Sequence, residues 1–301
     1  MKVAELGSIR RAADVLNVAS SAINRKILNL EKDLGLALFR RTSKGVVPTS
    51  AGMLLLRHAR ETLGDFQRTI DEIVSQTGEL KGSVRIMGLG SIIDRILPDI
   101  IAGLAKTHTG VSFHVLDESP DNVVEALKTG HVDIGITFLD RRHRELQMCA
   151  HLNTTVGAVM RSDHPLAIRS SVTLTECAAY DSAMFSDRWT IMPLVESEFQ
   201  QTGAEFKPRI TTNSMAIMRA AILHGIGIGF FTPIGFIEEI RQGEINFVPL
   251  RAGNSSPDGI GLFASQGALT SPAVRAIIDR LSEVFSDLQS ALALLESPKL
   301  V

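Results

Sequence analysis

The chain has few cysteines and no long uninterrupted run of apolar residues. Its 301 residues include two cysteines, Cys149 and Cys177, which form no CxxC or metal-binding pattern, so we expect reduced thiols. The most apolar segment, residues 216–236, is interrupted by Arg219, His224, glycines and a proline, so no membrane span is predicted. The charged start MKVAELGSIRR does not match a signal peptide. These absences exclude a disulfide-stabilised scaffold and a membrane protein, and they predict a cytoplasmic location.

The sequence also lacks the motifs of common enzyme classes. It contains no HExxH, no GxSxG and no P-loop. The segment GIGIG at residues 225–229 lacks the spacing of a dinucleotide-binding loop and is followed by two phenylalanines, so it predicts tight packing. We therefore expect no enzyme, no cofactor and no metal site.

Charge is distributed unevenly along the chain. Residues 1–60 hold 11 Lys and Arg against 4 Asp and Glu, a net charge of +7, whereas the other residues hold 20 against 29, a net charge of −9. A basic head on an acidic body indicates a polyanionic partner for the head alone. The length allows two or three domains, and 45% hydrophobic residues suffice for their cores.

Two short helical patterns with a break between them occupy the basic head. Ser8 is a good N-cap for the first, and the second runs from about Ser20 to Leu34, where Gly35 ends it. Within the second helix, apolar residues recur at intervals of four, three and four and predict one buried stripe. That stripe consists of Ile23, Ile27, Leu30 and Leu34.

The opposite face of the second helix carries short polar side chains and an arginine, which suit base edges and phosphates. The basic segment LFRRTSKGVVPTSAG that follows predicts a β-wing. A charged helix face alone is commonly just solvated, but the helix-turn-helix spacing, the wing and the local charge together favour DNA. The candidate DNA-contacting residues are Arg10, Ser20, Ser21, Asn24, Arg25, Arg41 and Lys44.

A long helix without proline is predicted from Ser50 to about residue 76. Its apolar residues repeat at alternating intervals of three and four, which is a heptad pattern typical of helix pairing. Packing against the chain's own domain remains the alternative, but paired reading heads favour a homodimer or homotetramer on double-stranded DNA. The seam residues are Leu56, Ala59, Leu63, Phe66, Ile70 and Ile73.

The remaining residues alternate between strand and helix patterns, including one helix expected over residues 92–108. This alternation predicts parallel sheets with helices on both faces, in two similar α/β lobes with a cleft between them. The expected domains are 1–50 for the DNA-binding head, 51–78 for the linker helix and 79–301 for the body. Within the body, lobe I is expected at about 83–155 and 264–290, and lobe II at about 156–263.

Ligands of such sheets bind at the carboxyl ends of the strands. Gly90 and Ser91 open one predicted helix there, and Asn213 and Ser214 open another, so both offer backbone N–H groups and a positive helix end to an anion. The alternative is that Ser91 and Ser214 only cap their helices. The expected effector is a small carboxylate, with Arg188 as a weaker candidate for an ion pair. The effector residues are Gly90, Ser91, Thr137, Asn213, Ser214, Phe231 and Thr232.

With these motifs the chain resembles the LysR-type transcriptional regulators over nearly its whole length. The matching stretches are residues 7–52 in the head and GSVRIMGLGSIIDRILP, GHVDIGIT, SDHPLA and AAILHGIGIGFFT in the body. The resemblance implies a winged helix-turn-helix, a dimerising linker helix and a two-lobed domain similar to periplasmic solute-binding proteins that senses a small molecule. A solute-binding module alone is the alternative function, but it leaves the head and the seam unexplained.

Two departures from the family pattern carry expectations of their own. Where relatives commonly have Ser-Gln-Pro-Ala at the start of the recognition helix, this chain has Ala19, Ser20, Ser21 and Ala22, so the usual N-cap hydroxyl is shifted or lost. The first helix of the family also has about ten more residues, and Met1 falls within it. We expect the natural start to lie upstream of Met1, because the shortened helix leaves Ile27, Leu30 and the face formed by Ala12 and Ala13 under-covered.

Overall fold

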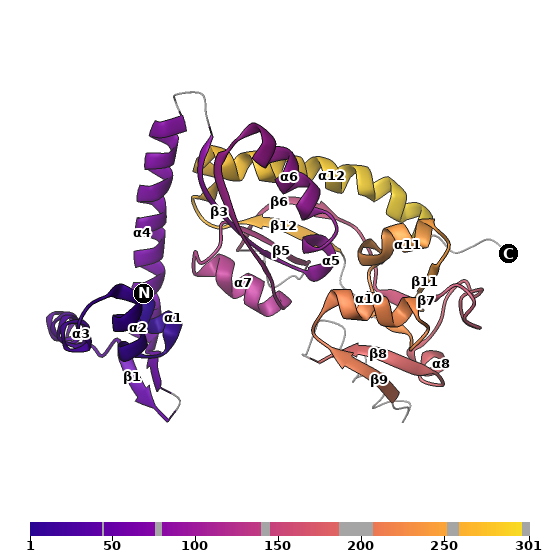
Figure 1. Cartoon of the computed structure of the whole chain (residues 1–301), viewed down its shortest axis with the longest axis horizontal. Coiled ribbons are helices and arrows are strands. Elements are labelled where there is room, and N and C mark those ends of the chain that lie inside the picture. Colours follow the sequence, from indigo (N-terminus) through magenta and orange to yellow (C-terminus); the bar gives the residue numbers. More distant parts are fainter. Residues whose placement is uncertain (44, 76–79, 140–144, 187–206, 252–258, 297–301) are drawn as a thin grey trace.

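The computed structural model describes residues 1–43, 45–75, 80–139, 145–186, 207–251 and 259–296. A small head, one long helix and two α/β lobes follow each other along the chain (Figure 1). Figure 1 shows the head at the left, lobe I in the middle and lobe II at the right. Within the described ranges, no helix is both long enough and apolar enough to cross a bilayer.

The head is a winged helix-turn-helix. Ser8 accepts a hydrogen bond from the Arg11 amide at the start of α2, and Asn17, at φ 55°, ends this helix in the left-handed region. Gly35, at φ 68°, ends α3 as predicted. The elements are α1 (Lys2–Leu6), α2 (Ile9–Leu16), α3 (Ser20–Leu34), β1 (Phe39–Thr42) and β2 (Gly45–Pro48).

Specific hydrogen bonds fix α3 against the wing. The Glu31 carboxylate near the end of α3 accepts bonds from the amides of Leu38 at 2.7 Å and Phe39 at 3.0 Å. The Val46 amide of β2 donates to the Gly7 carbonyl at 2.8 Å, which ties the wing to the turn between α1 and α2. These bonds hold α3, the wing and the turn between α1 and α2 together.

The apolar stripe of α3 is less buried than its spacing predicts. Ile23 and Ile27 are half-buried, whereas Leu30 is 43% and Leu34 49% exposed. The reason is an open groove of about 330 Å³ between α3, α1, the wing and the start of the following helix, which borders Ile23, Ile27 and Leu30. The prediction of a buried stripe is thus wrong for its second half. The predicted under-coverage is observed for Ile27 and Leu30 but is wrong for Ala12 and Ala13, which are 0% and 1% exposed.

The long helix α4 (Ser50–Ser75) has two different faces. Leu56 is buried in the head, but Leu63, Phe66, Ile70 and Ile73 are between 38% and 65% exposed. The last four of the six predicted seam residues are therefore exposed, and only the first two, Leu56 and the half-buried Ala59, pack within the chain.

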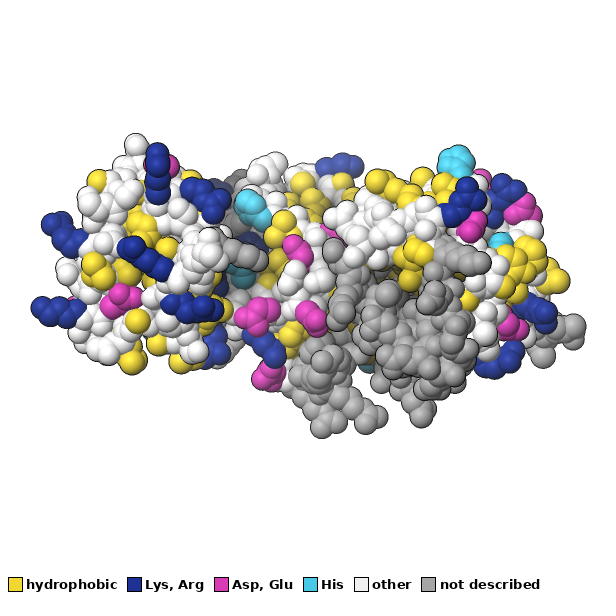
Figure 2. Space-filling model, turned by 90° about the horizontal axis from the view of Figure 1, so that it is seen from below, with side chains coloured by type: hydrophobic (Ala, Val, Ile, Leu, Met, Phe, Trp, Pro, Cys, Tyr) yellow, Lys and Arg dark blue, Asp and Glu magenta, His cyan; other side chains and the backbone are white. Residues whose placement is uncertain are grey.

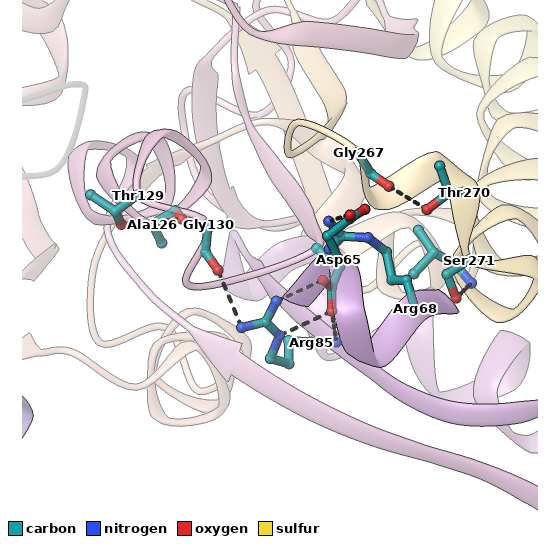
Figure 3. A network of polar contacts seen from close by, with 11 residues as sticks. Asp65, Arg68, Arg85, Ala126, Thr129, Gly130, Gly267, Thr270 and Ser271 are labelled. Carbon is teal, nitrogen blue, oxygen red and sulfur yellow. Dashed lines mark hydrogen bonds and ion pairs between the residues drawn. The ribbon is translucent and has the colours of Figure 1, made fainter. Parts of the chain in front are cut away.

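The other face of α4 lies against lobe I (Figure 3). Arg68 has a side chain only 11% exposed and reaches the turn at Gly267, where a Cβ would lie 3.0 Å from its Nη2 atom. Nearby, the Arg85 guanidinium donates to both oxygens of the buried Asp133 carboxylate, at 2.7 Å and 3.1 Å. This bidentate pair ties the strand that carries Arg85, which contacts α4, to the start of the neighbouring strand after Asp133.

Lobe I contains a five-stranded sheet in the order β4-β3-β5-β12-β6. The pairs of β3 with β4 and with β5 are parallel, as predicted, but β12 is antiparallel to both β5 and β6. The prediction of a purely parallel sheet was wrong because β6 had no recognised pattern and β12 returns from the distant end of the chain. The strands are β3 (Lys81–Gly88), β4 (Gly110–Asp117), β5 (Ile134–Phe138), β6 (Gln147–Leu152) and β12 (Ile260–Ala264).

Helices cover both faces of this sheet. Ile86 packs into a core with α6 and α12, while the next residue, Met87, packs with α7 on the opposite face, because successive strand side chains alternate. Figure 1 shows α12 running along lobe I towards lobe II. The helices are α5 (Gly90–Ile93), α6 (Leu97–Thr107), α7 (Pro120–Lys128), the 3₁₀ turn η3 (Ala268–Thr270) and α12 (Pro272–Glu296).

The single helix expected over residues 92–108 is two helices. Pro98 occupies the first turn of α6, and it has no N–H to donate to the carbonyl four residues earlier. The chain therefore breaks between α5 and α6, and this break presents Arg95 to lobe II.

Lobe II has two small sheets, with β7 antiparallel to both β10 and β11, and with β8 parallel to β9. β12 belongs to the lobe I sheet, so the chain returns to lobe I by Ile260, a few residues earlier than predicted. The elements are β7 (Gly157–Arg161), α8 (Leu174–Cys177), β8 (Asp181–Phe185), β9 (Lys207–Thr212), α10 (Met215–Leu223), β10 (Gly229–Phe231), η2 (Pro233–Phe236), α11 (Ile237–Arg241) and β11 (Ile245–Pro249).

Candidate effector cleft and DNA-binding surface

A cavity lies between the two lobes where several strands end. Its free space is about 40 Å³, enough for only a few water molecules as the lobes stand. A metabolite therefore requires the lobes to separate or the lining side chains to turn. Leu89, Gly90, Ser91 and Phe138 line it from lobe I, and Val156, Phe185, Met215, Phe230, Phe231 and Thr232 line it from lobe II.

The walls of this cleft are mainly aromatic and aliphatic. The rings of Phe185 and Phe231 meet edge to face with centroids 5.5 Å apart, and Phe231 lies 5.3 Å from Phe236 behind it. Polar contacts come from the hydroxyls of Ser91 and Thr232. An apolar wall with a few hydroxyls fits a ligand that has an apolar body and a small polar end.

The start of α5 already holds a carboxylate of the chain itself. The Gly90 N–H donates to Asp117 at the end of β4, and a Cβ on Gly90 would lie 2.7 Å from this carboxylate. Desolvation, and then repulsion from Asp94 and Glu118, raises the pKa of Asp117 to about 6, although the Gly90 bond opposes this rise. The lobe I side of the cleft is therefore acidic at neutral pH.

The start of α10 differs, because no carboxylate of the described chain is bonded to it. Ser214 caps α10 by accepting a bond from the Ile217 amide at 3.4 Å, and the next residue, Met215, lines the cleft. Ser214 is therefore a helix cap, as the alternative interpretation expects. Ser91 is not a cap, because Leu89 occupies the N-cap position of α5 without a side-chain bond.

The cleft brings together four of the seven predicted effector residues, namely Gly90, Ser91, Phe231 and Thr232. Ser214 and the exposed Asn213 lie beside it on the approach to α10. Thr137 is fully buried, and its hydroxyl has no partner among the described residues, but it does not line the cavity. Arg188 lies outside the described residues.

An ion triad around the buried Glu239 joins the two lobes behind the cleft. Arg95 of lobe I donates to the Glu239 carboxylate on α11, and Arg219 Nε on α10 lies 3.6 Å from the same oxygen. Glu239 is 7% exposed. Desolvation, followed by repulsion from Arg95, lowers the pKa of Arg219. Arg219 also donates two bonds to the Gly235 carbonyl, at 3.2 Å and 3.3 Å.

The outer face of the head carries the predicted DNA-contacting residues. Arg10, Arg25 and Arg41 are exposed and form no ion pair within the described part of the chain. Basic side chains spread over the head at the left of Figure 2, with few acidic ones among them. The predicted loss of the N-cap hydroxyl is observed, since Ala19 precedes α3 without a side-chain bond.

The polar residues at the start of α3 lie on the same outer surface. Ser20 and Ser21 are exposed and Asn24 is half-buried, so their side chains can reach a groove that admits α3. Lys44, at the tip of the wing, lies outside the described residues.

Two family models match the chain, and together they cover most of it. The model described as a bacterial regulatory helix-turn-helix protein of the lysR family matches residues 1–53, and the LysR substrate binding domain matches residues 77–286. The chain belongs to the LysR family. It is accordingly a DNA-binding transcriptional regulator with an effector-binding domain, and this family is not one of enzymes.

Individual relatives agree with this assignment. The HTH-type transcriptional regulator PcaQ of Agrobacterium fabrum is 26% identical over 291 residues, which cover 95% of this chain and 94% of that protein. ArgP of Mycobacterium tuberculosis has a TM-score of 0.66 at 20% identity and covers 95% of this chain and 94% of its own. Full-length OxyR of Pseudomonas aeruginosa has a TM-score of 0.64 at 16% identity, covering 93% and 91%. The two structures show the same fold.

Sequence reasoning missed six residues that line the cleft, and it missed the ion triad. Leu89 and Phe138 line the cleft directly beside predicted strand ends. Because ligands bind at the carboxyl ends of strands, counting one more residue at each of these ends would have included both. No sequence signal identifies the ion triad, because Arg95 and Glu239 are 144 residues apart.

Proposed function

We propose that this regulator senses a small carboxylate with an apolar body, bound in the cleft between the lobes. The observation that carries the proposal is the composition of the cleft, which combines the Phe185 and Phe231 rings with the Ser91 and Thr232 hydroxyls and the first turn of α10. Uncompensated N–H groups and the helix dipole make such a turn favourable for an anion.

The carboxylate is assigned to the α10 side of the cleft. Asp117 already takes the Gly90 amide, and its negative charge repels a second anion at α5. On the other side, the Met215 amide lies in the first turn of α10, beside Ser214 and Asn213. Of the two helix ends predicted as anion sites, α10 is therefore the one that we retain, with Gly90, Ser91, Phe231 and Thr232 as contacts for the rest of the ligand.

For DNA we propose that α3 enters the major groove. Ser20, Ser21, Asn24 and Arg25 would face the bases, and Arg10, Arg41 and Lys44 would contact phosphates. The exposure of the three arginines and the net charge of the head support this assignment. A cytoplasmic location accompanies it, because the target DNA lies there.

We further propose that α4 pairs two chains into a homodimer, which can assemble into a homotetramer. Four large apolar seam side chains are exposed on a helix whose opposite face already packs on lobe I, and such a stripe is stable in water only when covered. Two heads on one dimer then bind two half-sites.

Calorimetric titration of the full chain with small carboxylates and their matched amides tests the effector proposal. We expect heat from apolar carboxylates only, with weaker binding after Ser214→Ala and Ser91→Ala, because these changes remove a cap and a hydroxyl at the cleft. Asn122→Ala, a change on the exposed surface of α7, is the control. Preference for uncharged or cationic compounds, or carboxylate binding that neither variant alters, would refute the proposal.

A further inference from the structure

A second opening lies on the other side of the interface between the lobes, and it shares no lining residue with the cleft. We call it the back groove. Its free space is about 490 Å³, so it can admit a small molecule without any movement of the lobes. The residues that line it come from the start of α6, from η2 and α11, and from α12.

The floor of the back groove is aliphatic. Ile96 and Ile100 come from lobe I, Ile234 and Ile237 from the segment around α11, and Val284 from one face of α12. Figure 1 shows α12 ending beside α11, so a ligand on this floor touches both lobes at once. Burial of an apolar group here would gain the usual hydrophobic stabilisation.

Arg95, Arg241 and Arg280 line the back groove, together with the acidic Asp99 and Glu238. Arg241 pairs with Glu238 at 3.2 Å and Arg280 pairs with Glu283 at 2.6 Å, and all four side chains are more than half exposed. Exposed pairs of this kind are weak and are easily exchanged for another anion.

The third arginine, Arg95, is held by the buried Glu239. Arg95 Nε and the second oxygen of Glu239 are buried without a hydrogen-bond partner among the described residues. An unpaired buried donor is costly, and Arg95 lines the groove, so its Nε–H is a donor that an anionic ligand can use.

The triad also connects the back groove to the cleft. Arg219 lies beside the same Glu239 carboxylate and donates to the Gly235 carbonyl. A Cβ on Gly235 would lie 2.7 Å from Met215 and 3.3 Å from Ser91, and both of these residues line the cleft. A shift of the Arg95 side chain can therefore affect the effector cleft through the side chains of Glu239 and Arg219.

We propose that the back groove is a second small-molecule site, which takes an amphipathic monoanion and is coupled to the cleft through Arg95, Glu239 and Arg219. The anionic end lies with the arginines and the apolar end lies on the isoleucines and Val284. Occupation of this groove changes the affinity of the cleft for its own ligand, and the reverse holds to the same extent.

Calorimetry of the full chain tests the site, with hexanoate and benzoate as probes and hexan-1-ol and hexylamine as uncharged and cationic counterparts. Ser91→Phe fills the cleft, and Val284→Phe fills the back groove. The double variant Arg241→Ala/Arg280→Ala removes two rim charges, and Arg209→Ala, which removes an exposed paired arginine elsewhere on lobe II, is its control. Thermal melts establish that each variant is folded.

The proposal predicts that hexanoate still binds to the Ser91→Phe variant. In this Ser91→Phe background, binding should weaken at least about fivefold when Arg241 and Arg280 are also replaced and should be lost when Val284→Phe is added, whereas adding Arg209→Ala should leave it unchanged. If the heat of hexanoate binding disappears in Ser91→Phe, and Val284→Phe and the double arginine variant bind hexanoate as the wild type does, hexanoate binds in the cleft. That result would overturn the proposal. Equal binding of hexan-1-ol, or no heat at all, would also overturn it.

Discussion

Single residues decide the charge of each side of the cleft. Asp117 takes the Gly90 amide at the start of α5, while Ser214 caps α10 with a neutral hydroxyl and leaves the charge of that end uncompensated. Two helix ends that look alike in the sequence thus have opposite preferences for an anion.

The raised pKa of Asp117 predicts a pH-dependent effect on stability. Because its folded pKa is about 6 against a usual 3.8, the fold favours the neutral acid, and this contribution is complete below pH 4 and lost as the pH rises through 6. Asp117→Asn should therefore increase the free energy of unfolding at pH 7.5 by about 1 kcal/mol after solvent screening, and by nothing at pH 4. Urea unfolding at both pH values, with the exposed Asp287→Asn as control, measures it. An equal effect at the two pH values would contradict the assignment.

Arg25 is predicted to read a base. Arg25→Ala should weaken binding to a specific DNA site by about 1–3 kcal/mol and relax the base preference at one position of that site. Arg41→Ala should instead weaken binding to all DNA sequences alike and reduce the slope of log affinity against log salt concentration by about one. Fluorescence anisotropy with labelled duplexes measures both effects, with the exposed lobe II arginine variant Arg169→Ala as control. Unchanged affinity and preference after Arg25→Ala would show that another residue reads the bases.

At the scale of elements, α4 connects two interfaces. Arg68 packs its inner face on lobe I, while Phe66 and Ile70 are 65% and 38% exposed on its outer face. A change of partner on one face can therefore be transmitted to the other along a rigid helix.

Phe66→Asp/Ile70→Asp should dissociate the proposed dimer, because it buries two charges against an apolar partner helix and costs several kcal/mol. Since both side chains are exposed within one chain, the fold of the monomer should be retained. Sedimentation velocity gives the mass, and Thr62→Asp/Thr69→Asp, two exposed positions of α4, is the control. A double variant with the mass of the wild type would show that this stripe is not the interface.

The sequence predicted correctly those elements whose ends or faces depend on residues close by in the chain. Ser8 and Gly35 set the bounds of α2 and α3, and the heptad pattern of α4 was readable because each depends on neighbours within a few turns. The antiparallel places of β6 and β12 were not predicted, because strand pairing joins residues far apart in sequence. Similarly, strand ends indicated Ser91 and Thr232, but Phe185, at the end of β8, was not selected because the sequence does not show which strand ends face each other.

At the scale of the whole molecule, the ion triad links lobe I to lobe II. Glu239→Gln leaves Arg95 and Arg219 close together without a counter-charge, so it should lower the free energy of unfolding by about 3 kcal/mol. The neighbouring Glu238→Gln removes only an exposed pair with Arg241 and should change it by less than about 1 kcal/mol. Urea unfolding of the two variants compares them directly, and equal effects would mean that the triad does not stabilise the lobe interface.

Two basic heads, brought together by α4, are proposed to read DNA as a pair. Selection of binding sites from a random pool of double-stranded DNA by the full chain, followed by sequencing of the bound fraction, tests this proposal most directly. We predict enrichment of two related half-sites in inverted orientation, with centres about one or more whole helical turns apart, and loss of this enrichment in the Arg25→Ala variant. A bound fraction with the same sequence distribution as the starting pool, or enrichment that persists in Arg25→Ala, would contradict the account.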